Sequence, residues 1–215
     1  MLRFHRRLAE IGLAATSDFG FVLAGGYAIS ANGMGDRPSE DVDLFTNRPD
    51  PDQFAAALDR LRQAYLSHGL QVEDERIRPT FADLHVTDPT TGETGNVQLG
   101  LDFRAFPPAT LDIGPVLDPR DAVGGKMSAL WSRGEARDYI DIATVLDSGR
   151  FSPEDVLAIA DRLEATPLDR RMLAVRFRGA GRHDERTFSR YGVDADERAR
   201  IVAWFTAWAE HIDPR

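Results

Sequence analysis

The sequence contains no cysteine among its 215 residues. This absence excludes a disulfide framework, thiolate metal sites and a cysteine nucleophile, whereas carboxylate and hydroxyl chemistry remain open. A reducing compartment, and therefore a cytoplasmic protein, is the expected setting.

Long hydrophobic runs are also missing. The N-terminal residues Met1–Arg7 are basic, as at the start of a secretion signal, but Glu10 interrupts the sequence before an apolar stretch develops. We therefore expect neither a signal peptide nor a membrane span. The sequence also has no internal repeat and no low-complexity linker.

Positive charge is in deficit, with 26 Lys and Arg against 35 Asp and Glu and a formal net charge of -9. This balance argues against a protein that coats nucleic acid nonspecifically, because phosphate-rich partners need local positive potential. One segment differs from the rest of the chain. Between Leu168 and Arg190 the sequence concentrates arginines at positions Arg170, Arg171, Arg176, Arg178, Arg182, Arg186 and Arg190.

The front of the chain predicts an α/β fold. An apolar run from Phe19 to Ala24 reads as a buried strand, and Gly25-Gly26 then leads through a tight turn into a short helix. Asp50-Pro51 is a typical helix start, with Asp as the N-cap and Pro at the first helical position. Two further strands, residues 81–87 and 97–103, flank a turn-rich stretch and predict an antiparallel pair.

The back of the chain predicts helices. Asp118-Pro119 is an N-cap and N1 pair before a helix over residues 122–131, and Ser152-Pro153 starts another in the same way. Further helices are expected over residues 135–146 and 199–212. We therefore expect an α/β domain over residues 1–112 and a helical region over residues 113–215.

Two acidic side chains in Asp41–Phe45 carry the strongest chemical signal. This segment alternates like a strand, so Asp41 and Asp43 lie about 7 Å apart at the backbone and face the same side. At about 5 Å, two such anions repel by roughly 3 kcal/mol, and a divalent cation between them removes this repulsion. Oxygen-only ligands favour Mg²⁺ or Mn²⁺ over Zn²⁺. Asp102, on the polar face of a neighbouring strand, is a candidate third ligand, or else a solvated edge residue.

Gly25-Gly26 and Ser39 are candidate phosphate ligands. Two glycines at a helix start bring backbone N–H groups close to phosphate oxygens, and the helix dipole adds a favourable field. The Ser39 hydroxyl, two residues before Asp41, can donate to the same phosphate. By themselves a Gly-Gly after a strand is usually only a turn, and Ser39 only a turn or cap residue. The order of strand, Gly-Gly, helix, loop and Ser-x-Asp-x-Asp favours the functional interpretation.

This order resembles the nucleotidyltransferase superfamily, whose signature is a Gly-Gly or Gly-Ser followed about a dozen residues later by Asp-x-Asp. Here 14 residues separate Gly26 from Asp41, a slightly longer interval. The resemblance implies a nucleotidyltransferase fold, in which a small mixed sheet is flanked by helices.

The back half resembles the AbiEii-type toxins more specifically, including the Men-type toxins. Residues 126–133 (KMSALWSR) and 137–142 (RDYIDI) look like the last two motifs of that family, and the similarity extends over nearly the whole chain. It implies that Gly25, Gly26, Ser39, Asp41 and Asp43 bind nucleoside triphosphate and metal, and that Lys126, Asp138 and Asp141 are also required for activity. The family pattern does not fix a third metal carboxylate.

The chemistry of these residues agrees with the resemblance. A lysine on a helix is a mobile cation suited to a triphosphate, and Arg133 is a further candidate for binding it. The alternative is that Lys126 is a solvated helix residue, and that Asp138 and Asp141 pair on the surface with Arg137 or Lys126. Which of the two aspartates acts is left open.

The resemblance implies a toxin of a toxin–antitoxin system that transfers a nucleoside monophosphate to RNA, tRNA 3′ ends in particular, with release of pyrophosphate. An antitoxin protein would be its partner. Arg176, Arg178 and Arg182 are candidate contacts for RNA phosphates, with a solvated helix face as the alternative.

Two other functions are compatible with the residues. An enzyme of the same fold that modifies a small molecule, such as an aminoglycoside-type antibiotic, is mildly favoured by the net charge of -9. The other is a non-catalytic nucleotide-binding module, which is disfavoured because a degenerate site would be expected to lose Asp-x-Asp or the lysine.

Overall fold

The computed structural model describes residues 1–213 and divides the chain into two units. The first unit comprises Met1–Asn32 and Pro38–Pro119, and the second comprises Gly33–Arg37 and Arg120–Arg215. The short segment Gly33–Arg37 therefore belongs to the second unit, although the residues on both sides of it belong to the first.

The first unit contains a mixed seven-stranded sheet in the order β3-β4-β5-β2-β1-β7-β6. Strand β2 runs parallel to β5, and β1 runs parallel to β7, while the other neighbours are antiparallel. The strands are β1 (Val22–Leu23), β2 (Asp41–Thr46), β3 (Gln71–Arg78), β4 (Phe81–Thr87), β5 (Thr94–Leu101), β6 (Ala109–Leu111) and β7 (Gly114–Val116).

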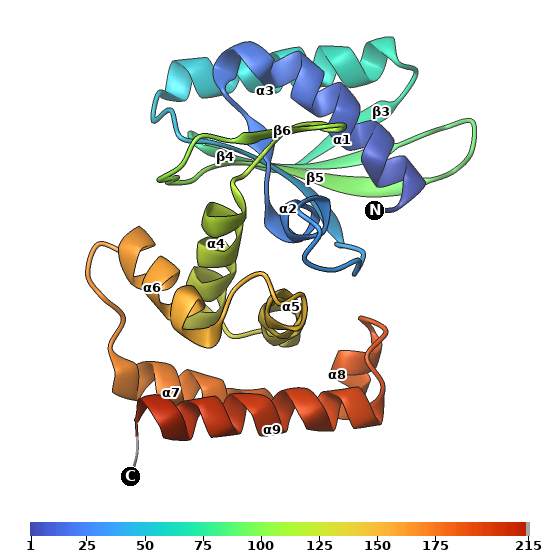
Figure 1. Cartoon of the computed structure of the whole chain (residues 1–215). Helices are drawn as coiled ribbons and strands as arrows, with labels where there is room; N and C mark the ends of the chain where they lie inside the picture. Colours follow the sequence, from blue (N-terminus) through green and yellow to red (C-terminus); the bar gives the residue numbers. More distant parts are fainter. Residues whose placement is uncertain (214–215) are drawn as a thin grey trace. The chain divides into compact units, whose positions relative to one another are not determined.

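Helices cover the two faces of this sheet unequally. The long helices α1 (Arg3–Thr16) and α3 (Pro51–Ser67) lie side by side on one face, and the short α2 (Gly25–Ala31) lies on the other (Figure 1). A short 3-10 turn, η1 (Ser17–Phe19), follows α1. Close packing explains the glycine in α1, since a β-carbon on Gly12 would lie 2.6 Å from Leu44 Cδ1 of β2.

The contact between Gly12 and Leu44 fixes which face of β2 is apolar. Because side chains alternate along a strand, Val42 and Leu44 point toward α1 and are fully buried. Asp41 and Asp43 therefore point to the opposite face, where α2 lies, and both are half-buried. The predicted helix start at Asp50-Pro51 is confirmed, because the Asp50 carboxylate accepts from the backbone N–H groups of Asp52 and Gln53.

The second unit is helical. Its elements are α4 (Pro119–Ser132), α5 (Ala136–Asp147), α6 (Pro153–Leu163), α7 (Arg170–Arg178), η2 (Gly179–Arg182), α8 (Glu185–Ser189) and α9 (Ala195–Ile212). Helices α7 and α9 lie side by side (Figure 1), and Phe177 stacks on Trp208 between them with ring centroids 4.3 Å apart. Tyr139 of α5 meets Phe205 edge-on at 5.0 Å and extends this aromatic core.

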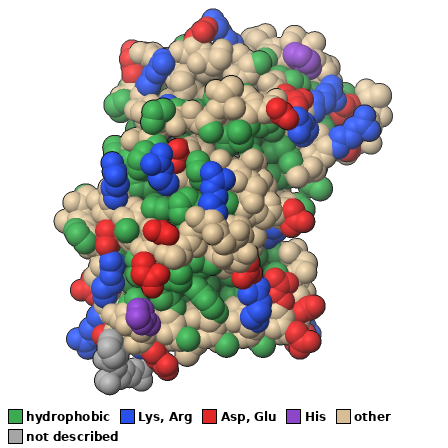
Figure 2. Space-filling model, viewed as in Figure 1, with side chains coloured by type: hydrophobic (Ala, Val, Ile, Leu, Met, Phe, Trp, Pro, Cys, Tyr) green, Lys and Arg blue, Asp and Glu red, His purple; other side chains and the backbone are tan. Residues whose placement is uncertain are grey.

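The expected α/β fold with a mixed sheet and helices is confirmed. Among the described residues, no helix is long and apolar enough to cross a membrane. On the molecular face shown in Figure 2, Lys and Arg side chains are interspersed with Asp and Glu side chains.

Candidate active site

Asp41 and Asp43 lie on β2 at the centre of the sheet. In the parallel register with β5, Asp41 is opposite Asn96 and Asp43 is opposite Gln98. Paired residues on neighbouring strands point to the same face, so the two carboxylates share that face with the two amide side chains. The predicted convergence of Asp41 and Asp43 on one side of the sheet is therefore present in the structure.

Gly25 lies directly against the carboxylate of Asp43. A β-carbon at position 25 would come within 2.6 Å of Asp43 Cγ and would overlap Oδ2. Gly25 also has φ +58°, in the left-handed region that favours glycine. The strand hydrogen bond from Ala24 N–H to the Asp43 carbonyl, 2.8 Å long, holds the two segments at this distance. Gly26, the next residue of α2, is buried.

The loop that carries Ser39 is tied to α2 through its backbone. The Tyr27 hydroxyl donates to the Ser39 carbonyl at 3.2 Å, and His5 Nδ1 lies 2.7 Å from the same hydroxyl. Because the hydroxyl has one proton and the carbonyl only accepts, His5 Nδ1 is the donor in the second bond. Burial, together with the nearby positive N-terminus, lowers the pKa of His5 and so favours the neutral form of its ring.

The structure does not bring Asp102 to the same place as Asp41 and Asp43. Strand β5 ends at Leu101, which pairs with Thr46, the last residue of β2. Asp102 is exposed and lies four residues beyond Gln98, which corresponds to about 13 Å along a strand. Its Oδ1 accepts from the N–H of Phe103. The register thus gives no support to Asp102 as a third ligand beside Asp43.

A buried acid on the same face of the sheet was not predicted from the sequence. Asp83 of β4 pairs with Gln98, so Asp43, Gln98 and Asp83 form a row of polar side chains across three strands, about 10 Å from end to end. Asp83 is 8% exposed, and its Oδ1 has no hydrogen-bond partner within residues 1–213. Arg76 donates to Oδ2 at 3.3 Å. The sequence pattern that could have identified Asp83 is the alternation in residues 81–87, where Asp83 and His85 lie between apolar residues.

The second unit contains a buried cluster of charges around Asp141. Lys126 Nζ of α4 lies 2.7 Å from Asp141 Oδ2, and Arg37 donates to both carboxylate oxygens at 2.8 and 3.1 Å. All three side chains are 10% exposed or less. Lys126 is therefore not a solvated helix residue. Arg37, from the segment Gly33–Arg37, is a second residue that was not predicted from the sequence.

Asp138 has a different environment from Asp141. It is fully buried, and Arg133 donates to its two oxygens at 3.0 and 2.9 Å. It also accepts from the backbone N–H of Glu135, which completes a capping box at the start of α5. These contacts assign Asp138 to the start of α5 and to the orientation of Arg133. Of the two aspartates, Asp141 is the one that contacts Lys126.

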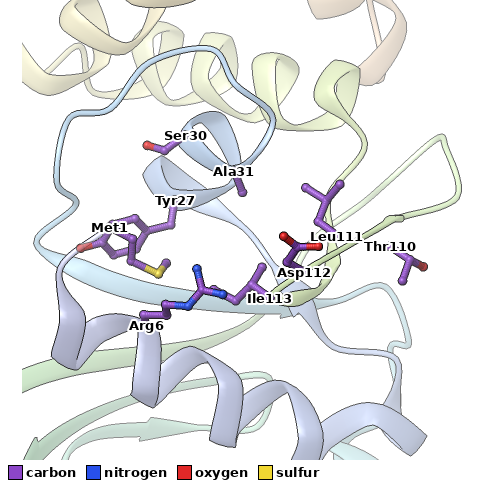
Figure 3. Close-up of a pocket in the computed structure, with 9 residues that line it drawn as sticks. All are labelled: Met1, Arg6, Tyr27, Ser30, Ala31, Thr110, Leu111, Asp112 and Ile113. Atoms are coloured by element: carbon purple, nitrogen blue, oxygen red, sulfur yellow. The ribbon is translucent and has the colours of Figure 1, made fainter.

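A pocket of about 450 Å³ opens beside α2 in the first unit. Tyr27 and Ser30 enter it from α2, Arg6 enters from α1, and Asp112 enters from the turn between β6 and β7 (Figure 3). Neither Asp41 nor Asp43 lines it. This pocket is therefore separate from the two strand carboxylates, and Tyr27 connects it with the Ser39 loop.

Comparison with known proteins gives a family match over nearly the whole chain. Residues 8–214 match the sequence model of the family described as "Nucleotidyl transferase AbiEii toxin, Type IV TA system". No curated protein matches the chain significantly.

Three solved structures with the same fold come from two bacteria. MenT4, a nucleotidyltransferase toxin from Mycobacterium tuberculosis H37Rv, has a TM-score of 0.64 at 17% identity, with 98% of this chain and 84% of that chain covered. The protein JHP933 from Helicobacter pylori has a TM-score of 0.56 at 16% identity, with 97% and 90% covered. A putative nucleotidyltransferase from H. pylori also has a TM-score of 0.56, at 14% identity, with 99% and 97% covered. These similarities show the nucleotidyltransferase fold.

Proposed function

The chain belongs to the AbiEii family of nucleotidyltransferase toxins of toxin–antitoxin systems, and on this basis we propose that it transfers a nucleoside monophosphate from a nucleoside triphosphate to a hydroxyl of RNA. The acceptor we propose is the 3′ end of tRNA. The observation that carries the proposal is the contact between Gly25 and Asp43, with Asp41 on the same face of the sheet. The contact between Gly25 and Asp43 places the backbone N–H groups at the start of α2 next to the Asp43 carboxylate.

The residues at this place fit Mg²⁺ or Mn²⁺ bound together with a triphosphate. Their donor set consists of carboxylate oxygens, which these hard cations prefer. Within residues 1–213 there is no group of three or more His, Asp or Glu side chains that could hold a metal by itself. Two carboxylates suffice, because Mg²⁺ in such sites takes its other ligands from water and substrate phosphates. When bound, the cation would neutralise phosphate charge and make the attacking hydroxyl more acidic.

The proposed reaction is an in-line displacement at the α-phosphorus. The acceptor oxygen forms a bond to this phosphorus, the bond to the bridging oxygen breaks, and pyrophosphate leaves while the hydroxyl proton passes to water. Asp41 and Asp43 would hold the metal. Backbone N–H groups at Gly25 and Gly26, with the Ser39 hydroxyl, contact the phosphates. The hydrogen bond from Tyr27 to the Ser39 carbonyl keeps that loop in place.

Lys126 is the proposed cation for the triphosphate, and Asp141 and Arg37 determine its position. A lysine side chain with a flexible four-carbon stem is held at one place by its ion pair with Asp141. If Lys126 exchanges this partner for a phosphate oxygen, Arg37 still neutralises Asp141 through two hydrogen bonds. The buried carboxylate would then not be left uncompensated, which lowers the energetic cost of the exchange.

The direct test is to incubate the purified chain with each labelled triphosphate and bulk tRNA, with Mg²⁺ and with chelator. We expect label in tRNA only with Mg²⁺, and none with Asp41→Asn or Asp43→Asn. Asp59→Asn on the exposed side of α3 is the matched control. Label on a small molecule but not on RNA would contradict the RNA acceptor. Binding of nucleotide without any transfer would contradict catalysis.

The proposed role as a toxin predicts growth arrest when the chain is expressed without its antitoxin. Asp41→Ala should abolish the arrest at equal protein level, because the metal would lose a ligand. An Asp41→Ala protein as toxic as the wild type would exclude metal-dependent transfer as the cause.

A further inference from the structure

The second unit contains a pocket of about 290 Å³ that brings together basic residues far apart in the sequence. Arg133 follows α4, Arg176 lies on α7, and Arg182 ends η2, and all three line the pocket. No Asp or Glu is among its lining residues. The sequence pattern assigned Arg133 to the triphosphate and the other two to RNA, whereas here they surround one cavity.

The walls of this pocket are held by two part-buried hydrogen bonds. The Tyr139 hydroxyl donates to the Arg176 carbonyl at 2.6 Å, and a β-carbon on Gly179 would lie 2.8 Å from that hydroxyl. His183 Nε2 lies 2.8 Å from the Gly134 carbonyl, and because a carbonyl only accepts, this nitrogen is the donor. The pocket is thus built by the fold around Tyr139, which is 1% exposed.

Two of the three arginines keep an uncompensated charge. Arg133 is neutralised by its bidentate pair with Asp138. Arg176 donates to the Ser132 carbonyl, and across the described part of the chain no ion pair within 4 Å involves Arg176 or Arg182. The pKa of the Tyr139 hydroxyl is raised to about 12, chiefly by burial; the charges of Arg176 and Arg182 act to lower it and the charge of Asp138 acts to raise it. Arg176, Arg182 and Tyr139 thus line one pocket in a protein of net charge -9.

Apolar side chains complete the pocket. Met172 and Val175, one turn apart on α7, line it and are 55% and 44% exposed. A flat, uncharged group can pack on them while an anion contacts Arg176 and Arg182. Guanidinium groups match the oxygens of a phosphate geometrically, and the volume suits a single nucleotide unit. This combination of anion and planar group is the chemistry of a nucleotide within a strand.

We propose that this pocket binds a phosphodiester of the RNA acceptor strand through Arg176 and Arg182, with an adjacent base against Met172 and Val175. The inference rests on the proposed function for the identity of the strand. Arg178, which the sequence pattern grouped with these two arginines, is not part of the pocket. Its Nη2 instead lies 3.5 Å from the Asp213 carbonyl, at the end of α9.

The test compares two double variants that remove the same charge. Arg176→Gln with Arg182→Gln changes the pocket, and Arg171→Gln with Arg186→Gln changes exposed arginines outside it. Affinity for a fluorescent single-stranded oligoribonucleotide is measured over a series of KCl concentrations. We expect the pocket variant to bind roughly tenfold weaker per arginine. The slope of log K against log salt should fall in magnitude by about 0.7, because one phosphate of the single strand is no longer neutralised. The control variant should keep the wild-type slope.

Three further outcomes separate this inference from the proposed function. If the pocket variant binds the oligonucleotide as the control does, the pocket does not hold RNA, even if nucleotide transfer by the wild type is intact. If the wild type transfers no nucleotide to RNA but the pocket variant still loses oligonucleotide binding, the proposed function fails and the pocket stands. The assignment to an RNA strand is overturned if binding of a nucleoside monophosphate, or of the antitoxin, requires the two arginines while binding of the oligonucleotide does not. Thermal unfolding of both variants checks that they fold.

Discussion

The Asp43 carboxylate occupies the space in which a β-carbon at position 25 would have to lie, so Gly25 and Asp43 are matched to each other across the start of α2. The same glycine has a positive φ. Replacement of Gly25 therefore has two separable effects, one on the backbone and one on the carboxylate.

We expect Gly25→Ala to lower Mg²⁺-dependent incorporation of nucleotide into RNA by at least about 100-fold, because Asp43 must move. The left-handed backbone should cost a further 1–2 kcal/mol, roughly, in the free energy of unfolding. Gly69→Ala is the matched control, since Gly69 also has a positive φ, +76°, but no atom lies within 4 Å of the position that a β-carbon would occupy there. It should lose similar stability and keep its activity. Equal activity losses in both variants would mean that backbone strain alone explains the effect.

Replacement of Asp141 should destabilise the protein more than replacement of Arg37. Asp141→Ala leaves two buried cations, Lys126 and Arg37, without this shared anion, and the expected loss is about 3–5 kcal/mol of unfolding free energy. Arg37→Gln leaves the ion pair between Lys126 and Asp141 intact and should cost less. Urea unfolding followed by circular dichroism measures both. A larger loss for Arg37→Gln would contradict the assignment of Asp141 as the centre of this cluster.

Asp102 offers a test of the strand register. Because Asp102 is exposed and beyond the last pair of β2 and β5, we expect Asp102→Asn to keep its nucleotide-transfer rate within about twofold, a change that corresponds to less than about 1 kcal/mol in the activation barrier. The assay is incorporation of labelled nucleotide at saturating Mg²⁺. A loss comparable with that of Asp43→Asn would restore Asp102 as a metal ligand and contradict the register argument.

The lowered pKa of His5 predicts a specific dependence of protein stability on pH. Its pKa in the folded protein is below the ordinary value of 6.5, so the unfolded chain binds more protons in the interval between the two pKa values. The contribution of His5 to stability is therefore complete above about pH 6.5 and is lost as the pH falls through the folded-state pKa. We expect the fall in Tm below about pH 6.5 to be shallower in His5→Gln than in the wild type.

His68→Gln is the control for that experiment, because His68 is exposed at the end of α3. Its Tm should follow the wild-type pH profile in shape. Parallel profiles for wild type and His5→Gln would show that proton uptake by His5 is not coupled to unfolding.

Local patterns in the sequence were sufficient to predict the fold class and part of the candidate site. Side-chain alternation placed Asp41 and Asp43 on one face, and Asp or Ser before Pro marked the starts of α3 and α6. The apolar run from Phe19 to Ala24 predicted a longer strand than β1, which has two residues, because Ser17–Phe19 forms a 3-10 turn. Such short elements depend on their neighbours in the sheet more than on their own residues.

The remaining features depend on contacts between distant parts of the chain. Spacing could not distinguish Asp138 from Asp141, because both are buried on α5, and the difference is that Arg37 and Lys126 pair with Asp141. The parallel register of β2 and β5 determines that Gln98, and not Asp102, is opposite Asp43. No local pattern encodes either fact.

The placement of Gly33–Arg37 in the second unit has a consequence for protein engineering. A polypeptide cut after Pro119 would separate Arg37 from the fragment that contains Asp141, although both belong to the same unit. A C-terminal fragment expressed alone would therefore keep Lys126 but lose Arg37 as a counter-ion for that carboxylate. Split-protein reporters or fragment-complementation assays built on this chain would need to supply residues 33–37 in trans, or graft them onto the helical fragment.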